Sequence, residues 1–111
     1  MAGCPMSRAM SIAETAADIR ERGQQAVTIT ADVGQLDQCE SACQTALQEH
    51  GPIDILINNV GGSARGGPVE MDEDTWDQQM AFNVKSVYLC CKAVLPHMEE
   101  QGSGVIINTG S

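Results

Sequence analysis

The sequence predicts an α/β fold built on a parallel sheet. Three observations lead to this prediction: helical and strand-like segments alternate, the strand-like segments are almost continuously apolar, and glycines stand where most segments end. Apolar strands fit a sheet that is covered on both faces, and parallel strands need a crossover, usually a helix, between them. The predicted order is helix, strand, helix, strand, helix, strand.

The first third of the chain contains one predicted helix and one predicted strand. Residues 1–10 show no periodicity, so we expect an irregular N-terminus there. A helix is predicted over residues 11–22, with Gly23 as its stop. Its apolar stripe consists of Ile12, Ala16 and Ile19. The β-branched run at residues 27–31 predicts a strand within residues 25–33.

A second helix and a second strand follow. The apolar stripe of the helix consists of Leu36, Cys39, Cys43 and Leu47. Gly51-Pro52 ends this helix, and residues 53–60 then form an apolar run that is typical of a strand buried on both faces. The glycines within residues 61–68 predict a loop whose backbone can approach a ligand closely.

The longest helix is predicted after Asp72, which is a suitable N-cap followed by acidic residues. Its buried face is predicted to consist of Met80, Val84, Val87, Cys91, Val94 and Met98. Pro96 is expected to kink or weaken its last turn, and Gly102 and Gly104 to end it before a buried strand at residues 105–109. This alternation predicts right-handed crossovers and a partial Rossmann-type, doubly wound parallel sheet.

The charge balance excludes several classes of partner. Six Lys and Arg oppose fifteen Asp and Glu, which gives a net charge of −9, and the acidic excess lies beyond residue 31. Such a surface repels nucleic acid and anionic lipid. No apolar run has the length of a membrane span, and residues 1–8 lack the apolar segment of a signal peptide. We therefore expect a cytoplasmic protein with no nucleic-acid or membrane partner.

The cysteines are predicted to be small apolar residues that stay reduced. Their number, five, is odd, no Cys-x-x-Cys occurs, and four of them fall within helical patterns. Cys39 and Cys43 stand at i and i+4 on one helix face, so a metal site there is an alternative. No His or second cysteine pair lies near them in sequence, and we predict no metal.

The motifs together resemble those of the short-chain dehydrogenase/reductase family. Residues 58–61 are Asn-Asn-Val-Gly, similar to the Asn-Asn-Ala-Gly signature of the family's fourth strand. Four further motifs follow the family's order and approximate spacing: Asp32-Val33, Asn83-Val84, Pro96-His97-Met98 and residues 104–111 (GVIINTGS). On these motifs, residues 11–111 are identified as a central part of a family member, similar to the 3-oxoacyl carrier-protein reductases.

The resemblance implies a site for NAD or NADP. Asp32 would accept a hydrogen bond from the adenine amino group, with the backbone of Val33 along the ring. The alternative for Asp32 is that it caps the following helix. Asn59, Val60 and Gly61 would lie where the strand's carboxyl end meets the cofactor. The family has Ala where Val60 stands, so this chain carries more bulk near the cofactor ribose.

Two further residues match catalytic positions of the family. Asn83 corresponds to the helix asparagine whose backbone carbonyl holds a water that links the catalytic lysine to solvent. Because Asn is unfavourable in mid-helix, a functional reason or a local kink is expected there. Ser111 corresponds to the catalytic serine, which would hydrogen-bond the substrate oxygen. The alternatives are an ordinary strand-end hydroxyl for Ser111 and, for Asn58 and Asn59, amides that tie neighbouring strands together.

Tyr88 and Lys92 reproduce the spacing of the family's Tyr-x-x-x-Lys pair, but in the wrong place. The family places that pair after the serine, whereas these two residues precede Ser111 on the long helix. Residues at i and i+4 of any helix lie on one face. We therefore predict that Tyr88 packs and that the stem of Lys92 covers it.

The family also has segments that these 111 residues do not contain. They are the first strand with its glycine-rich pyrophosphate turn, the second strand that selects NAD or NADP, and everything after the fifth strand. Residues 11–111 would then be a partial NAD(P)-binding domain. In the Rossmann strand order 3-2-1-4-5-6, the strand that ends at Asp32 is the third, and these residues do not contain the second strand that would lie beside it. The third strand would therefore stay unpaired or slip in beside the fourth strand. We expect this chain alone to be inactive, marginally stable and prone to aggregate or dimerise.

Two functions follow as alternatives. The first is part of an NAD(P)-dependent oxidoreductase that interconverts a small alcohol and a carbonyl, in a parent enzyme that is a homo-oligomer, a dimer or a tetramer. The second is a catalytically inactive short product that acts as a binding or dimerisation module. The sequence does not indicate which alcohol or which of the two nucleotides is used.

Overall fold

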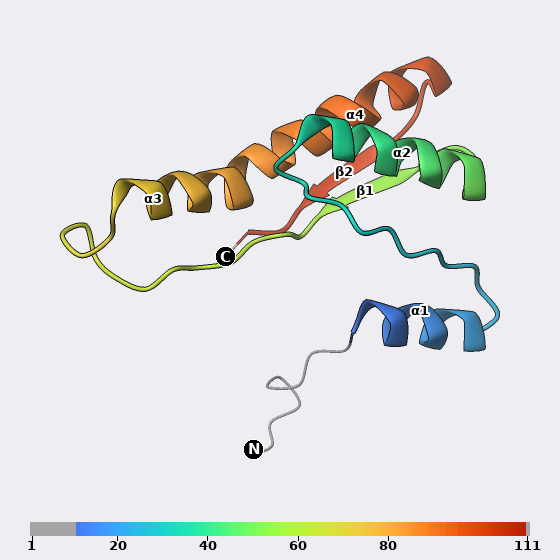
Figure 1. Cartoon of the computed structure of the whole chain (residues 1–111). Coiled ribbons are helices and arrows are strands. Elements are labelled where there is room, and N and C mark those ends of the chain that lie inside the picture. Colours follow the sequence, from blue (N-terminus) through green and yellow to red (C-terminus); the bar gives the residue numbers. More distant parts are fainter. Residues whose placement is uncertain (1–10, 111) are drawn as a thin grey trace. The chain divides into compact units, whose positions relative to one another are not determined.

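The computed structural model describes residues 11–110 and divides into two compact units, residues 1–30 and residues 31–111 (Figure 1). The predicted irregular N-terminus at residues 1–10 lies outside the described residues. In the second unit, two helices cover one face of a two-stranded sheet. Within the described part of the chain, no helix combines the length and the apolar character needed to cross a membrane.

The first unit contains helix α1, Ile12–Glu21, as predicted. The hydroxyl of Ser11 caps it by accepting a hydrogen bond from the backbone N–H of Glu14 at 3.1 Å. Gly23 follows the helix with a φ of 84°, a left-handed conformation that glycine adopts without strain. The Arg20 guanidinium then donates to the backbone carbonyl of Ala26 at 2.8 and 3.2 Å, which ties the following segment to the helix.

The strand predicted within residues 25–33 does not form. Residues 24–32 have no strand structure, and no described strand pairs with them. The β-branched run supplies the local preference for a strand, but a strand also needs a neighbour to complete its hydrogen bonds. The segment is therefore unpaired, which is one of the two outcomes expected for it, and it does not insert beside the fourth strand.

The sheet consists of β1, Ile55–Asn58, and β2, Val105–Asn108. The two strands are parallel and in register from Ile55↔Val105 to Asn58↔Asn108. This pairing confirms the predicted parallel sheet, although both strands are shorter than the apolar runs that predicted them. Helix α2, Leu36–His50, precedes β1 and ends at Gly51, which has a φ of 81°.

The long helix between the strands has three parts. Helix α3, Glu73–Met80, leads into a π-helical segment, η2, Ala81–Lys85, and then into α4, Ser86–Gln101. Gly102 ends α4 with a φ of 78°, as predicted. Helix α4 continues past Pro96 to Gln101. That Pro96 kinks or weakens the last turn stays a prediction.

Asp72 caps α3, and its charge state should control the first turn of this helix. Its carboxylate accepts a hydrogen bond from the Thr75 N–H at 2.7 Å, which lowers the pKa of Asp72 below its ordinary value. Because the pKa of Asp72 is lower in the folded state than in the unfolded state, its ionised carboxylate stabilises the fold at pH values above the unfolded-state pKa. This stabilisation is lost as the pH falls through the folded-state pKa. We expect acid to fray α3, seen as amide exchange at Thr75 and Trp76, and Asp72→Asn to reduce this pH dependence. A wild-type pH profile equal to that of Asp72→Asn would contradict this assignment.

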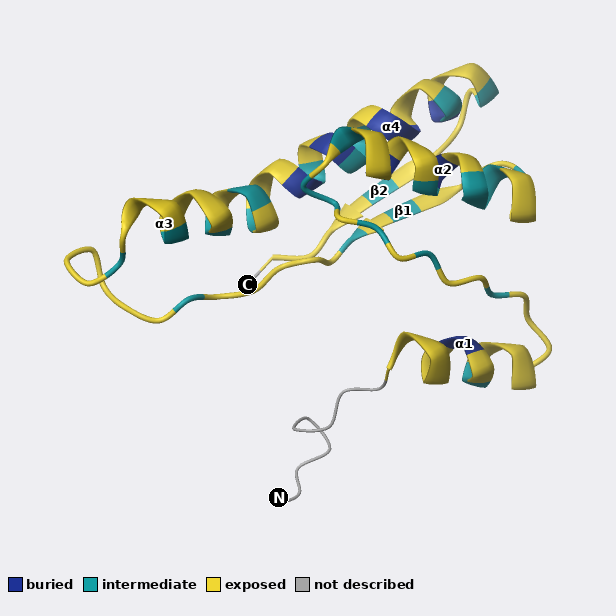
Figure 2. Cartoon of the chain, in the orientation of Figure 1, coloured by how far each residue is buried: buried dark blue, intermediate teal, exposed yellow. Residues whose placement is uncertain are grey.

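The core lies between α2, α4 and one face of the sheet (Figure 2). Its buried members are Cys39, Cys43, Leu89, Ala93, Val94 and Met98. Leu56 and Ile106, one from each strand, pack against them from the sheet. The alternate residues of both strands face away from this core and are exposed: Ile55, Ile57, Val105 and Ile107. We call these four residues the open sheet face.

The open sheet face corrects the prediction that both strands are buried on both faces. Their composition suits a two-sided burial, but α2 and α4 cover one side only in the part of the chain that the structure describes. An exposed apolar face of this kind favours association.

The predicted buried face of the long helix is correct only in its second half. Val94 and Met98 are buried, and Val87 and Cys91 are half-buried, but Met80 and Val84 are exposed. The reason is that α3 and η2 contain no buried residue and make their main contacts with the other parts of the long helix, so no neighbouring element within the described residues covers this half. The helix surface that packs on α2 and β1 instead begins at Ser86 and Leu89.

Candidate functional site

A cavity of about 640 Å³ lies at the carboxyl ends of the two strands. Because β1 and β2 are parallel and in register, the segments that follow them begin side by side. The cavity is lined by Asn59, Val60, Gly61, Gly62, Ser63, Asn83, Thr109 and Gly110. Three of the predicted cofactor-binding residues thus lie together with the predicted helix asparagine.

Asn83 fastens the loop after β1 to the long helix. Its side-chain N–H donates to the backbone carbonyl of Gly62 at 2.9 Å, and its side-chain oxygen accepts from the Gly62 N–H at 2.8 Å. The same amide donates to the Gln79 carbonyl at 2.9 Å, one turn earlier in the helix. Asn83 stands in the middle of η2, so the local irregularity expected at this residue is confirmed. Its water-binding role stays a prediction.

Gly61 is required by the same contact. A Cβ atom at this position would lie 2.8 Å from the side-chain oxygen of Asn83, closer than such atoms approach each other. With any other residue at this position, either the Asn83 side chain would have to give up its bonds to Gly62 or the loop would have to move. The half-exposed Val60 side chain forms the neighbouring part of the wall.

Asn58 ties the two strands together, as predicted. Its side-chain N–H donates to the side-chain oxygen of Asn108, its register partner, at 2.9 Å. The same N–H group lies 3.8 Å from the Cys91 sulfur on α4. This cross-strand bond holds the two strand ends, and hence the two sides of the cavity, at a fixed spacing.

The Asn58 to Asn108 bond can be measured with a double-mutant cycle. We expect Asn58→Ala and Asn108→Ala each to lower the free energy of unfolding by about 1 kcal/mol. The double variant should cost less than the sum of the two, because both single changes remove the same bond. Urea unfolding followed by circular dichroism gives these values. Strict additivity would show that the amide pair contributes nothing to stability.

Asp32 and Val33 lie in the turn before α2 and do not line the cavity. One carboxylate oxygen of Asp32 accepts from the Gly34 N–H at 2.9 Å, and the Asp32 N–H donates to the Gln38 side chain at 2.7 Å. The capping alternative is therefore wrong as stated, because the carboxylate caps the turn and not the helix, whose N-cap is Gln35. The adenine role of Asp32 stays a prediction, as does that of Val33, which packs against the core.

The catalytic serine predicted at Ser111 lies outside the described residues. Thr109 and Gly110, immediately before it, line the cavity, although sequence reasoning did not single them out. Gly62 and Ser63 also line the cavity, and they lie in the loop at residues 61–68 that was predicted to approach a ligand, although neither was named as a site residue. The rule that residues following parallel strands face the ligand side of the sheet would have found Thr109 and Gly110.

Tyr88 and Lys92 do not belong to this site. The Lys92 ammonium lies 3.4 Å from the Tyr88 hydroxyl and 5.6 Å from its ring centroid, so the lysine covers the tyrosine as predicted. Tyr88 itself is 58% exposed, so the prediction that it is a packing residue is wrong for this chain. Neither residue lines the cavity.

Comparison with known proteins defines the class. The family model of short chain dehydrogenases matches residues 5–111, and the chain belongs to this family. It is 40% identical over 90 residues to 2-(R)-hydroxypropyl-CoM dehydrogenase of Xanthobacter autotrophicus, covering 75% of this chain and 34% of that protein. It is 32% identical over 94 residues to a 3-oxoacyl-[acyl-carrier-protein] reductase of Staphylococcus epidermidis, covering 85% and 38%.

A solved structure supports the fold. A protein from Burkholderia xenovorans, assigned to the short-chain dehydrogenase/reductases, superimposes with a TM-score of 0.82 at 36% identity. The match covers 91% of this chain and 41% of that one. The α/β fold is thus a partial Rossmann fold, and the chain spans about a third of the length of the curated relatives it matches.

The residues around the cavity fit one part of a nicotinamide dinucleotide. Gly61 and Gly62 contribute only backbone to the wall, and most of the wall is polar. Both features suit the close approach of a ribose and its hydroxyl groups to the ends of the strands.

Proposed function

We propose that this chain forms part of an NAD(P)-dependent oxidoreductase that interconverts an alcohol and a carbonyl compound by hydride transfer. The observation that carries the proposal is the cavity at the carboxyl ends of β1 and β2, in a chain of the short-chain dehydrogenase family. Ligands of open parallel sheets bind at this edge. The parent enzyme would act as a homo-oligomer, either a dimer or a tetramer.

Each predicted site residue has a definite task in this proposal. Asn59, Val60 and Gly61 would hold the ribose next to the nicotinamide, and Asp32 with Val33 would bind the adenine. NAD or NADP would supply the hydride acceptor or donor when bound. Asn83 keeps the loop after β1 in place through Gly62. These residues orient the nucleotide and leave its reactive face open to substrate.

The hydroxyl of Ser111 would hydrogen-bond the substrate oxygen where charge develops during hydride transfer. This task needs no proton to leave the serine, because a hydrogen bond to the oxygen already stabilises its charge. The proposed serine follows Thr109 and Gly110, which line the cavity.

The test begins with the coding DNA on both sides of the 111 residues. A reading frame that continues after Ser111 into Tyr-x-x-x-Lys supports the oxidoreductase, and the protein encoded by that frame can be expressed. It should reduce NAD⁺ or NADP⁺ with a secondary alcohol, followed by nicotinamide absorbance. Ser111→Ala should abolish this activity without changing nucleotide binding. A folded protein that binds neither nucleotide would overturn the proposal.

The open sheet face favours a second candidate function, that of a binding or dimerisation module. Within residues 11–110, the sheet has four exposed apolar side chains and two edges that no other strand pairs with, an unusual surface for a chain that works alone. A stop codon directly after Ser111 would support this candidate.

A further inference from the structure

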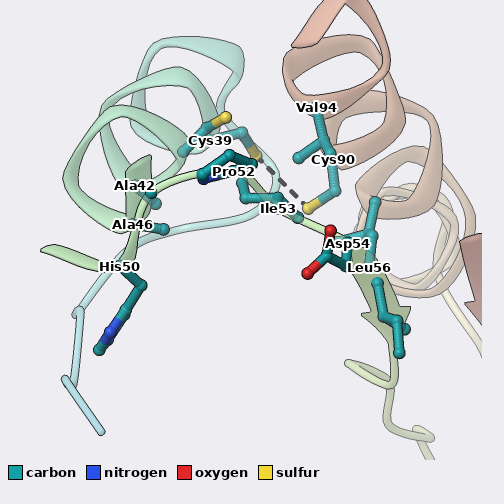
Figure 3. A pocket seen from close by; sticks show the side chains of 13 residues that line it. Cys39, Ala42, Ala46, His50, Pro52, Ile53, Asp54, Leu56, Cys90 and Val94 are labelled. Atoms are coloured by element: carbon teal, nitrogen blue, oxygen red, sulfur yellow. Dashed lines mark hydrogen bonds between the residues drawn. The ribbon is translucent and has the colours of Figure 1, made fainter. Parts of the chain in front are cut away.

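The packing of α2 on α4 brings two thiols into contact (Figure 3). The sulfur of Cys39, on α2, lies 3.8 Å from the sulfur of Cys90, on α4, although 51 residues separate them in sequence. Cys39 is 5% exposed and Cys90 is half-buried. Both are free thiols, and both line a cavity of about 390 Å³ between α2, α4 and β1.

The other two described cysteines have different partners. The Cys43 thiol donates to the backbone carbonyl of Ala93 at 3.6 Å, and the Cys91 sulfur faces the side chain of Asn58. Among residues 11–110, no group of three or more His, Cys, Asp or Glu residues is placed to hold a metal ion. Cys39 and Cys90 therefore differ from Cys43 and Cys91, their cysteine neighbours on the same helices, because among these four residues only the sulfur atoms of Cys39 and Cys90 contact each other.

We propose that Cys39 and Cys90 form an oxidation site that closes to a disulfide between α2 and α4 when the chain meets a peroxide. The sulfurs are already in van der Waals contact, and a disulfide requires about 2.05 Å between them. Rotation of the side chains can close this gap, because the cavity beside them leaves room for movement. The same cavity is large enough to admit a small oxidant such as hydrogen peroxide.

The reaction balances with one peroxide. The more exposed thiolate, that of Cys90, attacks a peroxide oxygen, the O–O bond breaks, and a sulfenic acid and hydroxide form. The sulfur of Cys39 then attacks the sulfenic sulfur, the S–O bond breaks, and the second hydroxide leaves. The protons released by the two thiols convert both hydroxides to water. The two sulfurs together lose two electrons, which reduce the peroxide.

The surroundings of Cys90 make this site slow at neutral pH. Burial, together with the neighbouring Cys39 and Cys91, raises the pKa of Cys90 to about 11. The charged or titratable groups that line the cavity with it are Cys39, Cys43, His50 and Asp54. Since the thiolate is the nucleophile, the rate of oxidation should rise about tenfold per pH unit below this pKa.

Peptide mapping of the full chain after treatment with hydrogen peroxide tests the proposal. Trypsin separates residues 23–65, which hold Cys39, from residues 86–92, which hold Cys90. Cleavage after Glu40 then separates Cys39 from Cys43. We expect a cross-link between residues 23–40 and 86–92 that is about 2 Da lighter than the two reduced peptides together. Its yield should increase from about pH 7 to about pH 9 and disappear on reduction.

Matched variants identify the two sulfurs. Cys43→Ser changes a cysteine on the same helix with the same exposure as Cys39, and Cys91→Ser changes the immediate neighbour of Cys90. Both variants should keep the cross-link, whereas Cys39→Ser and Cys90→Ser should lose it by at least about tenfold. In concentrated urea the wild-type chain should lose its preference for this pair.

Three results would overturn the proposal. The first is sulfinic acid at Cys90 with no cross-link, and the second is a cross-link that persists in Cys39→Ser or Cys90→Ser. The third is oxidation mainly through Cys4, which would join separate chains. If a variant does not fold, mapping of the wild-type chain still tests a link between α2 and α4, because cleavage after Glu40 assigns the α2 partner to Cys39, and the absence of a cross-link to residues 86–92 would overturn the proposal.

Discussion

Replacing Leu89 by alanine is expected to lower the free energy of unfolding by about 3 kcal/mol. Leu89 is 4% exposed and lies in α4 at the centre of the core that α2 and the sheet share. The cost combines the lost burial of its side chain with the cavity left behind. Because a chain of this size has only a few kcal/mol in total, the variant should be largely unfolded at room temperature. Urea titration followed by circular dichroism measures the change.

Leu95→Ala is the matched control for Leu89. It removes the same atoms from the same helix at a position that is 38% exposed and outside the core cluster. We expect this variant to lose less than about 1 kcal/mol. Equal losses at the two positions would mean that α4 does not pack on α2 through Leu89.

Replacing Ile57 by lysine should weaken self-association of the chain at least about tenfold. Ile57 is 60% exposed, and it lies opposite Ile107 in the register of the two strands, at the centre of the open sheet face. Burying these side chains between two copies would contribute about 1 to 2 kcal/mol for each isoleucine, which lysine would remove. Sedimentation velocity over a range of micromolar concentrations measures the dissociation constant.

Ile12→Lys is the control for this surface, since Ile12 is an equally exposed isoleucine, at 60%, in α1. It should leave association unchanged. A wild-type chain that is monomeric throughout the concentration range, with a sharp and reversible unfolding transition, would contradict the association and with it the second candidate function.

Sequence patterns predicted the ends of helices and the pairing of strands well where interactions between residues close in sequence, or the composition of the segment itself, determine them. Asp72 and Gly102 stand at helix ends because their side chain or backbone satisfies the terminal groups, and both were predicted there. Ser11 was placed at the start of its helix, and the structure adds that it is the N-cap. Asn58 was recognised as a link between strands, and the structure has that link. The parallel pairing of β1 and β2 followed from their apolar composition and the helix between them.

The features that sequence reasoning missed depend on neighbours that a local pattern does not contain. The run at residues 27–31 has strand propensity without a strand to pair with, and the strands have two apolar faces with helices on only one. The first half of the long helix has an apolar stripe but no neighbour among the described residues to cover it, and no 3.6-residue pattern predicts the π segment around Asn83. Gly62 became part of the site only through its bonds to Asn83.

The long sequence separation between the two paired strands also limits how fast this chain can fold. Every strand pair joins residues far apart in sequence, as with Asn58 and Asn108, which are 50 residues apart. Closing so long a loop costs entropy before any strand hydrogen bond forms, so topologies of this kind fold slowly. Helices α2 and α4 can form early from local contacts, and the sheet would be the last element to assemble. Until it does, the apolar segments of both strands remain accessible to other chains, and chaperones would act during that interval.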